Sequence, residues 1–223
     1  MQKNYYLMRS TRLWDMQHGH SRSLNLLNQE IGESYSKKYI EEINSILHLT
    51  LEFCTESIGL GSSQYVAHPI RVAHLVHLYQ KPQKSFFNIK LALIHNILEV
   101  SSLNFYQAEK LFGLEIIEDV KTLTIDKKKR WDKKYLDIYY NKINISNHRL
   151  KLIKCCDKLD NLFLLEDNES VEEKKLYLEE INNYVLPLAS QVNDDFYSYF
   201  LSIFKETFKI ISEQENRLQT NQS

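Results

Sequence analysis

The sequence predicts an all-α fold, a helical bundle of about eight to ten helices. Two observations support this prediction. The 223 residues include only five glycines and three prolines, below the average usage of about 7% and 5%, so most of the turns that a many-stranded protein needs are missing. Apolar residues also recur at the three- and four-residue spacing of amphipathic helices along most of the chain.

A chain of this length can bury one sizeable core. We expect an N-terminal arm at 1–35, one helical domain at 36–215 and a disordered tail at 216–223. The arm is polar and lacks a sustained apolar period, so it is expected to be irregular apart from a short helix around 24–27. An apolar stripe from Tyr39 onward predicts the first long helix, which ends near Gly59 and Gly61.

The next helices are expected to form the centre of the bundle. His68 precedes Pro69, a residue preorganised for the first turn of a helix, which would place His68 at a helix entrance. The segment 86–98 is apolar nearly all round, as is typical of a helix surrounded by others. A Ser101-Ser102 start then predicts a short helix that is closed by Gly113.

The second half of the chain continues the helical pattern. Further helices are expected at 115–124, from Trp131 and Tyr135 onward, and at 148–165, 171–192 and 196–211. Asn147 can cap the helix that follows it, and Pro187 should kink or break its own helix. The segment Lys127–Lys134 is expected to be a charged connection.

The charge balance argues against two classes of partner. Lys and Arg total 28 against 29 Asp and Glu, so no global excess indicates a nucleic acid or a membrane surface. The sequence also shows neither a signal segment nor an apolar run long enough to cross a bilayer. We therefore expect a cytoplasmic protein.

Three cysteines, Cys54, Cys155 and Cys156, occur in the chain. An odd number with two adjacent residues suits neither a disulfide framework nor a four-ligand zinc site. We interpret them as small buried hydrophobic residues.

Polar residues on apolar helices mark the candidate site. His95 and Glu99 are four residues apart, so they would project from one face of the central helix. Asp157 and Asn161 repeat this spacing on a later helix. Together with His68, they offer nitrogen and oxygen donors that suit a divalent ion such as manganese, iron or zinc.

Five segments, in this order, resemble the HD superfamily of metal-dependent phosphohydrolases, and specifically its alarmone hydrolase branch. They are YVAHPIRVAHLV at 65–76, ALIHNILEV at 92–100, FGLEIIEDVKTLT at 112–124, KLIKCCDKLDNL at 151–162 and YVLPLAS at 184–190. The resemblance covers roughly residues 39–191.

The resemblance implies an HD-domain helical bundle and a (p)ppGpp 3′-pyrophosphohydrolase of the stringent response. The implied ligands of a Mn²⁺ ion are His68, His95, Asn96 and Asp157. The implied catalytic positions are Glu99, which would position the attacking water, and Asn96. The implied substrate-binding residues are Asn161, Lys154 and Arg71. The partner would be a nucleotide or another phosphorylated small molecule.

The sequence departs from the family pattern at several positions. Asn96 stands where the family has an aspartate and offers a neutral carbonyl oxygen in place of a charged carboxylate. It is either a weakened ligand or a structural substitute. Val100 replaces an acidic residue, Leu164 replaces a frequent hydroxyl residue, and the stretch 58–64 lacks the Arg and Lys that the family places around guanine.

These departures leave two alternatives to hydrolysis of ppGpp. One is a catalytically degenerate HD protein that binds a nucleotide or protein partner without turnover. The other is an HD-fold enzyme with a changed substrate. The segment Lys127–Lys134 either neutralises substrate phosphates, with Trp131 stacking on a base, or is a solvated connection.

Other clusters are given structural interpretations. Neither His18 with His20 nor His74 with His77 is expected to be a metal site. An aromatic stripe is expected to form core or a subunit contact, which leaves a homo-oligomer open. Its tyrosines are Tyr135, Tyr139, Tyr140, Tyr177 and Tyr184.

Overall fold

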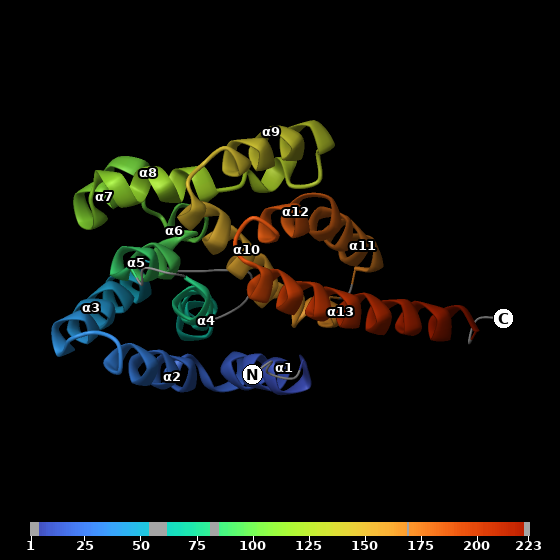
Figure 1. The fold of residues 1–223 in the computed structure, drawn as a ribbon, viewed down its shortest axis with the longest axis horizontal. Coiled ribbons are helices and arrows are strands. Elements are labelled where there is room, and N and C mark those ends of the chain that lie inside the picture. Colours follow the sequence, from blue (N-terminus) through green and yellow to red (C-terminus); the bar gives the residue numbers. More distant parts are fainter. Residues whose placement is uncertain (1–4, 54–61, 81–84, 169, 221–223) are drawn as a thin grey trace.

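The computed structural model describes residues 5–53, 62–80, 85–168 and 170–220 (Figure 1). These residues form thirteen α-helices and three short 3₁₀ or π segments, and none of them lies in a β-strand. The all-α prediction is confirmed. The helices outnumber the predicted eight to ten because the N-terminal region is helical and two predicted helices are each divided.

The N-terminal region differs from its prediction. Residues 1–35 were expected to be irregular apart from a short helix around 24–27. That helix is part of α2 (Ser21–Gly32), but the region also contains α1 (Tyr5–His18), and a turn in which Gly19 has a φ of 81° joins the two. Two of the three buried residues of α1 are the charged Arg12 and Asp15. Because α1 packs through ion pairs as well as apolar contacts, its sequence lacks the period that reveals an amphipathic helix.

Helix α3 (Lys37–Phe53) follows, as predicted, and α4 (Ser62–Tyr79) is the central helix of this half of the molecule. In Figure 1, α4 lies between α1 and α2 below and α5 and α10 above, and it contacts all four. The placement of His68 at a helix entrance is wrong, because α4 begins six residues earlier and Pro69 lies inside it. His68 therefore projects from the middle of a helix.

The apolar segment expected at 86–98 is divided. Helix α5 (Phe86–Ile94) ends before His95, and a one-turn helix, α6 (Ile97–Val100), follows. Between them Asn96 has φ −119° and ψ 14°, outside the helical region, so the chain changes direction there. The prediction that His95 and Glu99 share one face of a continuous helix is therefore wrong.

Helices α7 (Phe105–Phe112) and α8 (Leu114–Leu123) form a pair that is joined at Gly113. The predicted start at Ser101-Ser102 is wrong, because Asn104 caps α7 in a reciprocal capping box with Gln107. The predicted end is confirmed, since Gly113 has a φ of 92°, which favours glycine.

A short 3₁₀ segment, η1 (Lys127–Lys129), leads into α9 (Lys133–Asn144). Helix α10 (His148–Leu162) then passes through the core and is followed by η2 (Leu165–Asp167). The predicted cap is confirmed, because the side chain of Asn147 accepts a hydrogen bond from the Leu150 N–H at 3.1 Å.

The C-terminal helices close the bundle. Helix α11 (Val171–Glu180) passes through a π-helical turn, η3 (Ile181–Val185), into α12 (Leu186–Ala189). Pro187 falls directly after this turn, which fits the predicted disruption because proline cannot donate the regular helical hydrogen bond. The final helix, α13 (Asp194–Thr220), continues past residue 216, where the tail was expected to begin.

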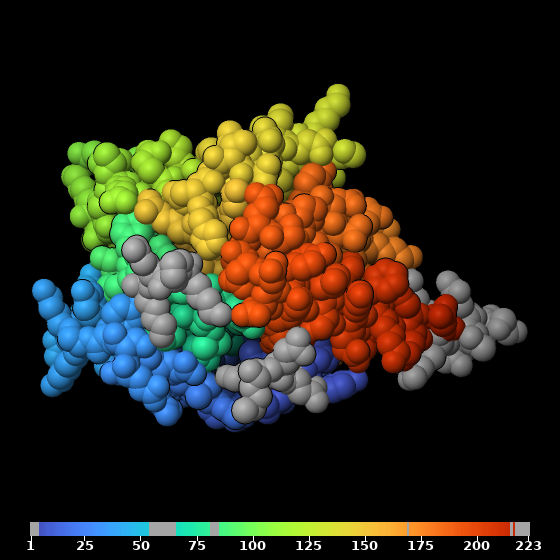
Figure 2. Space-filling view, in the orientation of Figure 1, coloured from blue at the N-terminus to red at the C-terminus, as the bar shows by residue number. Residues whose placement is uncertain are grey.

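The core combines residues of nearly all these helices. Cys155 and Cys156 are buried and free, as expected, whereas Cys54 lies outside the described residues. Tyr139, Tyr140 and Tyr177 are also buried, so the core interpretation of the aromatic stripe is confirmed for them. Figure 2 shows the C-terminal helices, in orange and red, covering a large part of one face. No helix among the described residues combines the length and apolar character needed to cross a lipid bilayer.

Candidate metal centre and substrate cavity

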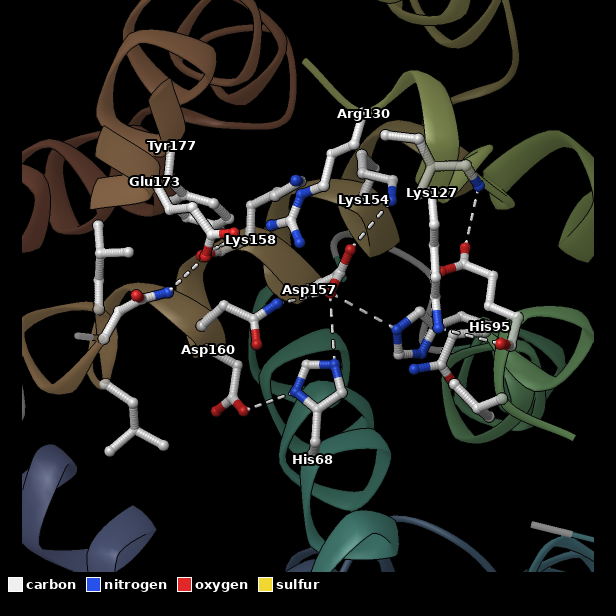
Figure 3. Close-up of a pocket in the computed structure, with 18 of the residues that line it drawn as sticks. His68, His95, Lys127, Arg130, Lys154, Asp157, Lys158, Asp160, Glu173 and Tyr177 are labelled. Atoms are coloured by element: carbon white, nitrogen blue, oxygen red, sulfur yellow. Dashed lines mark hydrogen bonds and ion pairs between the residues drawn. The ribbon is translucent and has the colours of Figure 1, made fainter. Parts of the chain in front are cut away.

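Three helical elements bring His68, His95 and Asp157 together. His68 comes from the middle of α4, His95 from the end of α5 and Asp157 from α10, and one donor atom of each lies within 4.8 Å of the others. Asp157 Oδ1 is 3.3 Å from His68 Nε2 and 3.7 Å from His95 Nε2 (Figure 3). These residues converge on one point, as a metal site requires.

The hydrogen bonds of His95 fit a metal ligand. Its Nδ1 lies 2.7 Å from the backbone oxygen of Ala92, and because a carbonyl oxygen can only accept, Nδ1 carries the proton. The other ring nitrogen, Nε2, is buried and makes no hydrogen bond within the described part of the chain. An unprotonated, buried nitrogen that faces a carboxylate is a suitable donor for a divalent ion.

His68 is oriented in the same way by a carboxylate. Its Nδ1 lies 2.8 Å from Asp160 Oδ2, which leaves Nε2 directed at Asp157. Metal-binding histidines commonly donate their second N–H to a carboxylate or carbonyl group. Both histidines therefore present Nε2 to the same point, so the residues present fit a divalent cation.

Electrostatic interactions keep Asp157 ionised. Burial alone would raise the pKa of Asp157, but the ammonium group of Lys154 and the hydrogen bond with His68 hold this pKa well below its usual value. Lys154 Nζ lies 3.0 Å from Asp157 Oδ2, and Asn161 Nδ2 donates to Asp157 Oδ1 at 3.0 Å. The same ion pair helps to raise the pKa of the buried Lys154 well above normal, against the effect of burial. The carboxylate of Asp157 is therefore charged at neutral pH.

A cavity of about 400 Å³ opens beside this cluster. We call the wall formed by His68, His95, Asn96, Glu99 and Asp157 the metal end. Glu99 is fixed there, because its Oε1 accepts a hydrogen bond from the Ile125 N–H at 3.0 Å. Asn96 lines the cavity next to His95 and makes no capping hydrogen bond with its side chain, although it precedes α6.

A second part of the cavity lining is mainly basic and aromatic, and we call it the cationic end. It is formed by Lys127, Arg130, Trp131, Lys158 and Tyr177, and in Figure 3 Arg130, Lys158 and Tyr177 lie close together, with Glu173 beside them. The Arg130 guanidinium lies 4.6 Å from the Trp131 ring centroid and 5.5 Å from that of Tyr177, which holds it by cation–π contacts. Lys127 Nζ donates to the Glu99 backbone oxygen at 3.1 Å and so links the two ends.

Lys158 has a deeper position than the other cations. Its Nζ lies 2.6 Å from Glu180 Oε1, and the hydroxyl of Tyr140 donates to the same oxygen at 2.5 Å. Burial lowers the pKa of Lys158, and Glu180 opposes that shift. This pair anchors the cationic end in the core.

No family model matches the chain. A Drosophila melanogaster protein, guanosine-3′,5′-bis(diphosphate) 3′-pyrophosphohydrolase MESH1, is 40% identical over 78 residues, which make up 34% of this chain and 42% of that protein. The matched segment therefore spans less than half of that relative.

Two solved structures are similar in fold. A metazoan SpoT orthologue that hydrolyses ppGpp superimposes with a TM-score of 0.61 at 24% identity, covering 77% of this chain and 96% of that one. The protein lmo0812 from Listeria monocytogenes EGD-e gives a TM-score of 0.51 at 21% identity, covering 65% and 97%. The chain has the HD-type fold of a ppGpp hydrolase.

Within this HD-type fold, the residues singled out from the sequence are brought to one cavity. They are His68, His95, Asn96, Glu99, Asp157, Asn161, Lys154 and Arg71. Their roles as metal, catalytic and substrate-binding residues stay predictions. Val100 and Leu164 line the same cavity, so two of the departures from the family pattern fall at the site. Within the stretch 58–64, residues 58–61 lie outside the described residues.

Sequence reasoning missed Asp160, Lys158, Tyr177 and Glu173, all of which line the cavity. Asp160 follows Asp157 by three residues on α10, a spacing that indicates the same face and could have identified it. No helical spacing relates Tyr177 to Asp157, because Tyr177 lies on a different helix, α11. Lys127, Arg130 and Trp131 line the cavity as the functional interpretation of the charged segment requires.

Proposed function

We propose that this chain is a metal-dependent phosphohydrolase that cleaves a nucleotide pyrophosphate of the guanosine-3′,5′-bis(diphosphate) class at its 3′ position. One observation carries the proposal: the His68, His95 and Asp157 cluster borders a cavity of about 400 Å³ that Lys127, Arg130, Trp131, Lys158 and Tyr177 also line. A divalent ion beside a cationic and aromatic surface suits a polyanion that carries a base. The similarity to MESH1, named for this reaction, supports the choice of substrate.

The residues would divide the reaction between the two ends of the cavity. His68, His95, Asp157 and the Asn96 carbonyl would hold a divalent ion, Mn²⁺ in our proposal. When bound, such an ion polarises a phosphoryl oxygen and lowers the pKa of a bound water. Glu99, whose other contacts hold it at the metal end, would orient the attacking water.

The cationic end would bind the phosphates and the base. Arg130 and Lys127 provide guanidinium and ammonium donors for phosphate oxygens. Trp131 offers an aromatic face on which a base can stack. Asn161, beside Asp157, would contact the sugar between these two groups.

A second candidate function is binding without turnover. Asn96 removes a charge from the ligand set, and Val100 removes a carboxylate from the neighbourhood of the water. An ion held by fewer charges is bound more weakly and acidifies its water less. These two residues favour a degenerate HD protein that binds a nucleotide.

Hydrolysis of ppGpp by the purified chain separates these candidates. The assay would follow release of pyrophosphate and GDP by anion-exchange chromatography, with Mn²⁺ and with excess EDTA. Mn²⁺-dependent release would support the proposed reaction. Binding of ppGpp without release, in both the wild type and Asn96→Asp, would favour the degenerate protein. Release only from other nucleotide pyrophosphates in a parallel panel would indicate a changed substrate.

A further inference from the structure

Four charged side chains form a buried cluster next to His68, which we call the charge network. They are Arg12 and Asp15 of α1, Arg71 of α4 and Asp160 of α10. The side chains of Arg12 and Asp15 are 0% exposed, that of Asp160 is 1% exposed, and that of Arg71 is 10% exposed. Two carboxylates and two guanidinium groups balance in charge, as buried ions require.

Asp160 is the centre of the charge network. Its Oδ2 accepts from His68 Nδ1 at 2.8 Å and from Arg71 Nη2 at 3.0 Å. Its Oδ1 accepts from Arg71 Nε at 3.1 Å and lies 2.5 Å from Arg12 Nη2. Both oxygens are therefore engaged, so this carboxylate is held in one orientation and fixes the His68 ring.

Asp15 of helix α1 binds the side of Arg71 that faces away from Asp160. Arg71 Nη1 donates to Asp15 Oδ2 at 2.7 Å, and that oxygen also accepts from Ser23 Oγ of α2 at 2.7 Å. Every nitrogen of the Arg71 guanidinium thus has a carboxylate partner. Arg71 lines the cavity, but its donors are committed to Asp15 and Asp160 and not to a substrate phosphate.

We infer that helix α1 helps to position His68 for metal binding. Arg12 acts through Asp160, and Asp15 acts through Arg71, which in turn binds Asp160. The inference rests on the proposed function only in requiring that the His68, His95 and Asp157 cluster binds a divalent ion. It assigns Arg71 and Asp160 a positioning role, in place of the substrate contact expected for Arg71. Outer partners of this kind commonly change metal affinity by about 10- to 100-fold when they are replaced.

A matched pair of variants tests the inference, because α1 carries a second arginine in a comparable ion pair. Arg9 pairs with Glu166 and with Asp167, at 2.6 Å, and neither of these ion pairs involves Asp160 or His68. Arg12→Gln breaks the charge network, whereas Arg9→Gln removes a more exposed ion pair of the same helix, since the Arg9 side chain is 22% exposed. Circular dichroism and thermal melting would establish that both variants are folded.

The first readout is calorimetric titration of the metal-stripped full chain with MnCl₂, without a nucleotide. We expect Arg12→Gln to weaken Mn²⁺ binding by about tenfold or more, and Arg9→Gln to bind as the wild type does. The second readout is the visible absorption of the Co²⁺-loaded chain, which reports ligand geometry and should change in Arg12→Gln only. Asp15→Asn, a milder change that keeps the side-chain shape, should shift both readouts in the same direction and replaces Arg12→Gln if that variant does not fold.

The outcomes separate this inference from the proposed function. Wild-type Mn²⁺ affinity and an unchanged Co²⁺ spectrum in a folded Arg12→Gln or Asp15→Asn variant would overturn the inference alone. Equal losses in Arg12→Gln and Arg9→Gln would overturn it too, because α1 would then act only as a structural anchor. Metal binding that depends on Arg12, in a chain that hydrolyses no nucleotide, would support the inference and contradict the proposed function. A wild-type chain that binds neither ion would contradict both.

Discussion

The two ends of the cavity are built in different ways. At the metal end, His68, His95 and Asp157 come from helices of the core, and buried partners fix each of them. At the cationic end, Lys158 and Tyr177 are buried residues of α10 and α11, but Arg130 and Trp131 come from a connection between helices and are half-buried. This difference agrees with the proposed function, in which a metal ion would need ligands of fixed geometry and a flexible polyanion would need charge and an aromatic face. Substitutions at the two ends should therefore have separable effects.

The largest effect on turnover is expected for Glu99→Gln. It keeps the shape and a hydrogen-bond acceptor for the Ile125 N–H but removes the charge that would orient and activate water. Loss of such a group costs about 10²- to 10⁴-fold in rate. Steady-state hydrolysis of ppGpp would measure it, with Mn²⁺ affinity by calorimetry as the control. A variant with the wild-type kcat would remove Glu99 from the mechanism.

At the cationic end, Arg130→Ala is expected to raise KM and to leave Mn²⁺ affinity unchanged. Loss of a charge-assisted hydrogen bond to phosphate costs about 1.5–3 kcal/mol, or roughly 10- to 150-fold in binding. Lys133→Ala is the matched control, because Lys133 lies in the same basic segment but its side chain is 82% exposed and is absent from the cavity wall. Equal changes in both variants would indicate a general charge effect and not a phosphate site.

Asn96→Asp tests whether the metal end is weakened by a missing charge. We expect it to bind Mn²⁺ about tenfold more tightly, a gain of about 1.4 kcal/mol, and to hydrolyse ppGpp faster. Calorimetry and the turnover assay measure the two effects. Asn147→Asp, which adds the same charge at the exposed cap of α10 and away from the cavity wall, is the control and should change neither. If Asn96→Asp gains neither affinity nor rate, Asn96 is a structural substitute and not a ligand.

The smallest effect is expected for Trp131→Leu. The variant keeps an apolar side chain but loses the flat aromatic face, which contributes about 0.5–1.5 kcal/mol to stacking beyond the area buried. KM should therefore rise by about two- to tenfold. The inhibition constant of inorganic pyrophosphate, a competitive ligand without a base, should stay at the wild-type value. A loss of affinity for pyrophosphate as well would place Trp131 against the phosphates.

The sequence predicted the metal end better than the cationic end for physical reasons. His95 follows an apolar helix, where an ionisable residue is costly and therefore conspicuous. His68 and Asp157 were identified by the resemblance to a known family and by the four-residue spacing of Asp157 and Asn161. Lys158 is one of several charged residues of α10 and does not stand out in the sequence. Tyr177 reaches the cavity only through the tertiary fold, in which its ring centroid lies 4.8 Å from Lys158 Nζ. The interruption at Asn96 was also hidden, because the residues on both sides of it are apolar and favour one continuous helix.

The N-terminal region was mispredicted because some of its polar residues are buried. Arg12 and Asp15 are polar in the sequence but fully buried in the structure, where each has a partner of opposite charge. Hydrophobic periodicity detects a helix only by an apolar face, and these two buried residues are charged, so the sequence of α1 predicts an irregular arm. Helices that pack through ion pairs are not detected by hydrophobic spacing.

The central claim is that His68, His95 and Asp157 hold a divalent ion, and titration of the metal-stripped chain with MnCl₂ tests it most directly. We expect one ion to bind to the wild type, no measurable binding to Asp157→Ala, and unchanged binding to Asp137→Ala, which removes an aspartate of α9 that is absent from the cavity wall. Mn²⁺ binding by Asp157→Ala with wild-type affinity would contradict the claim.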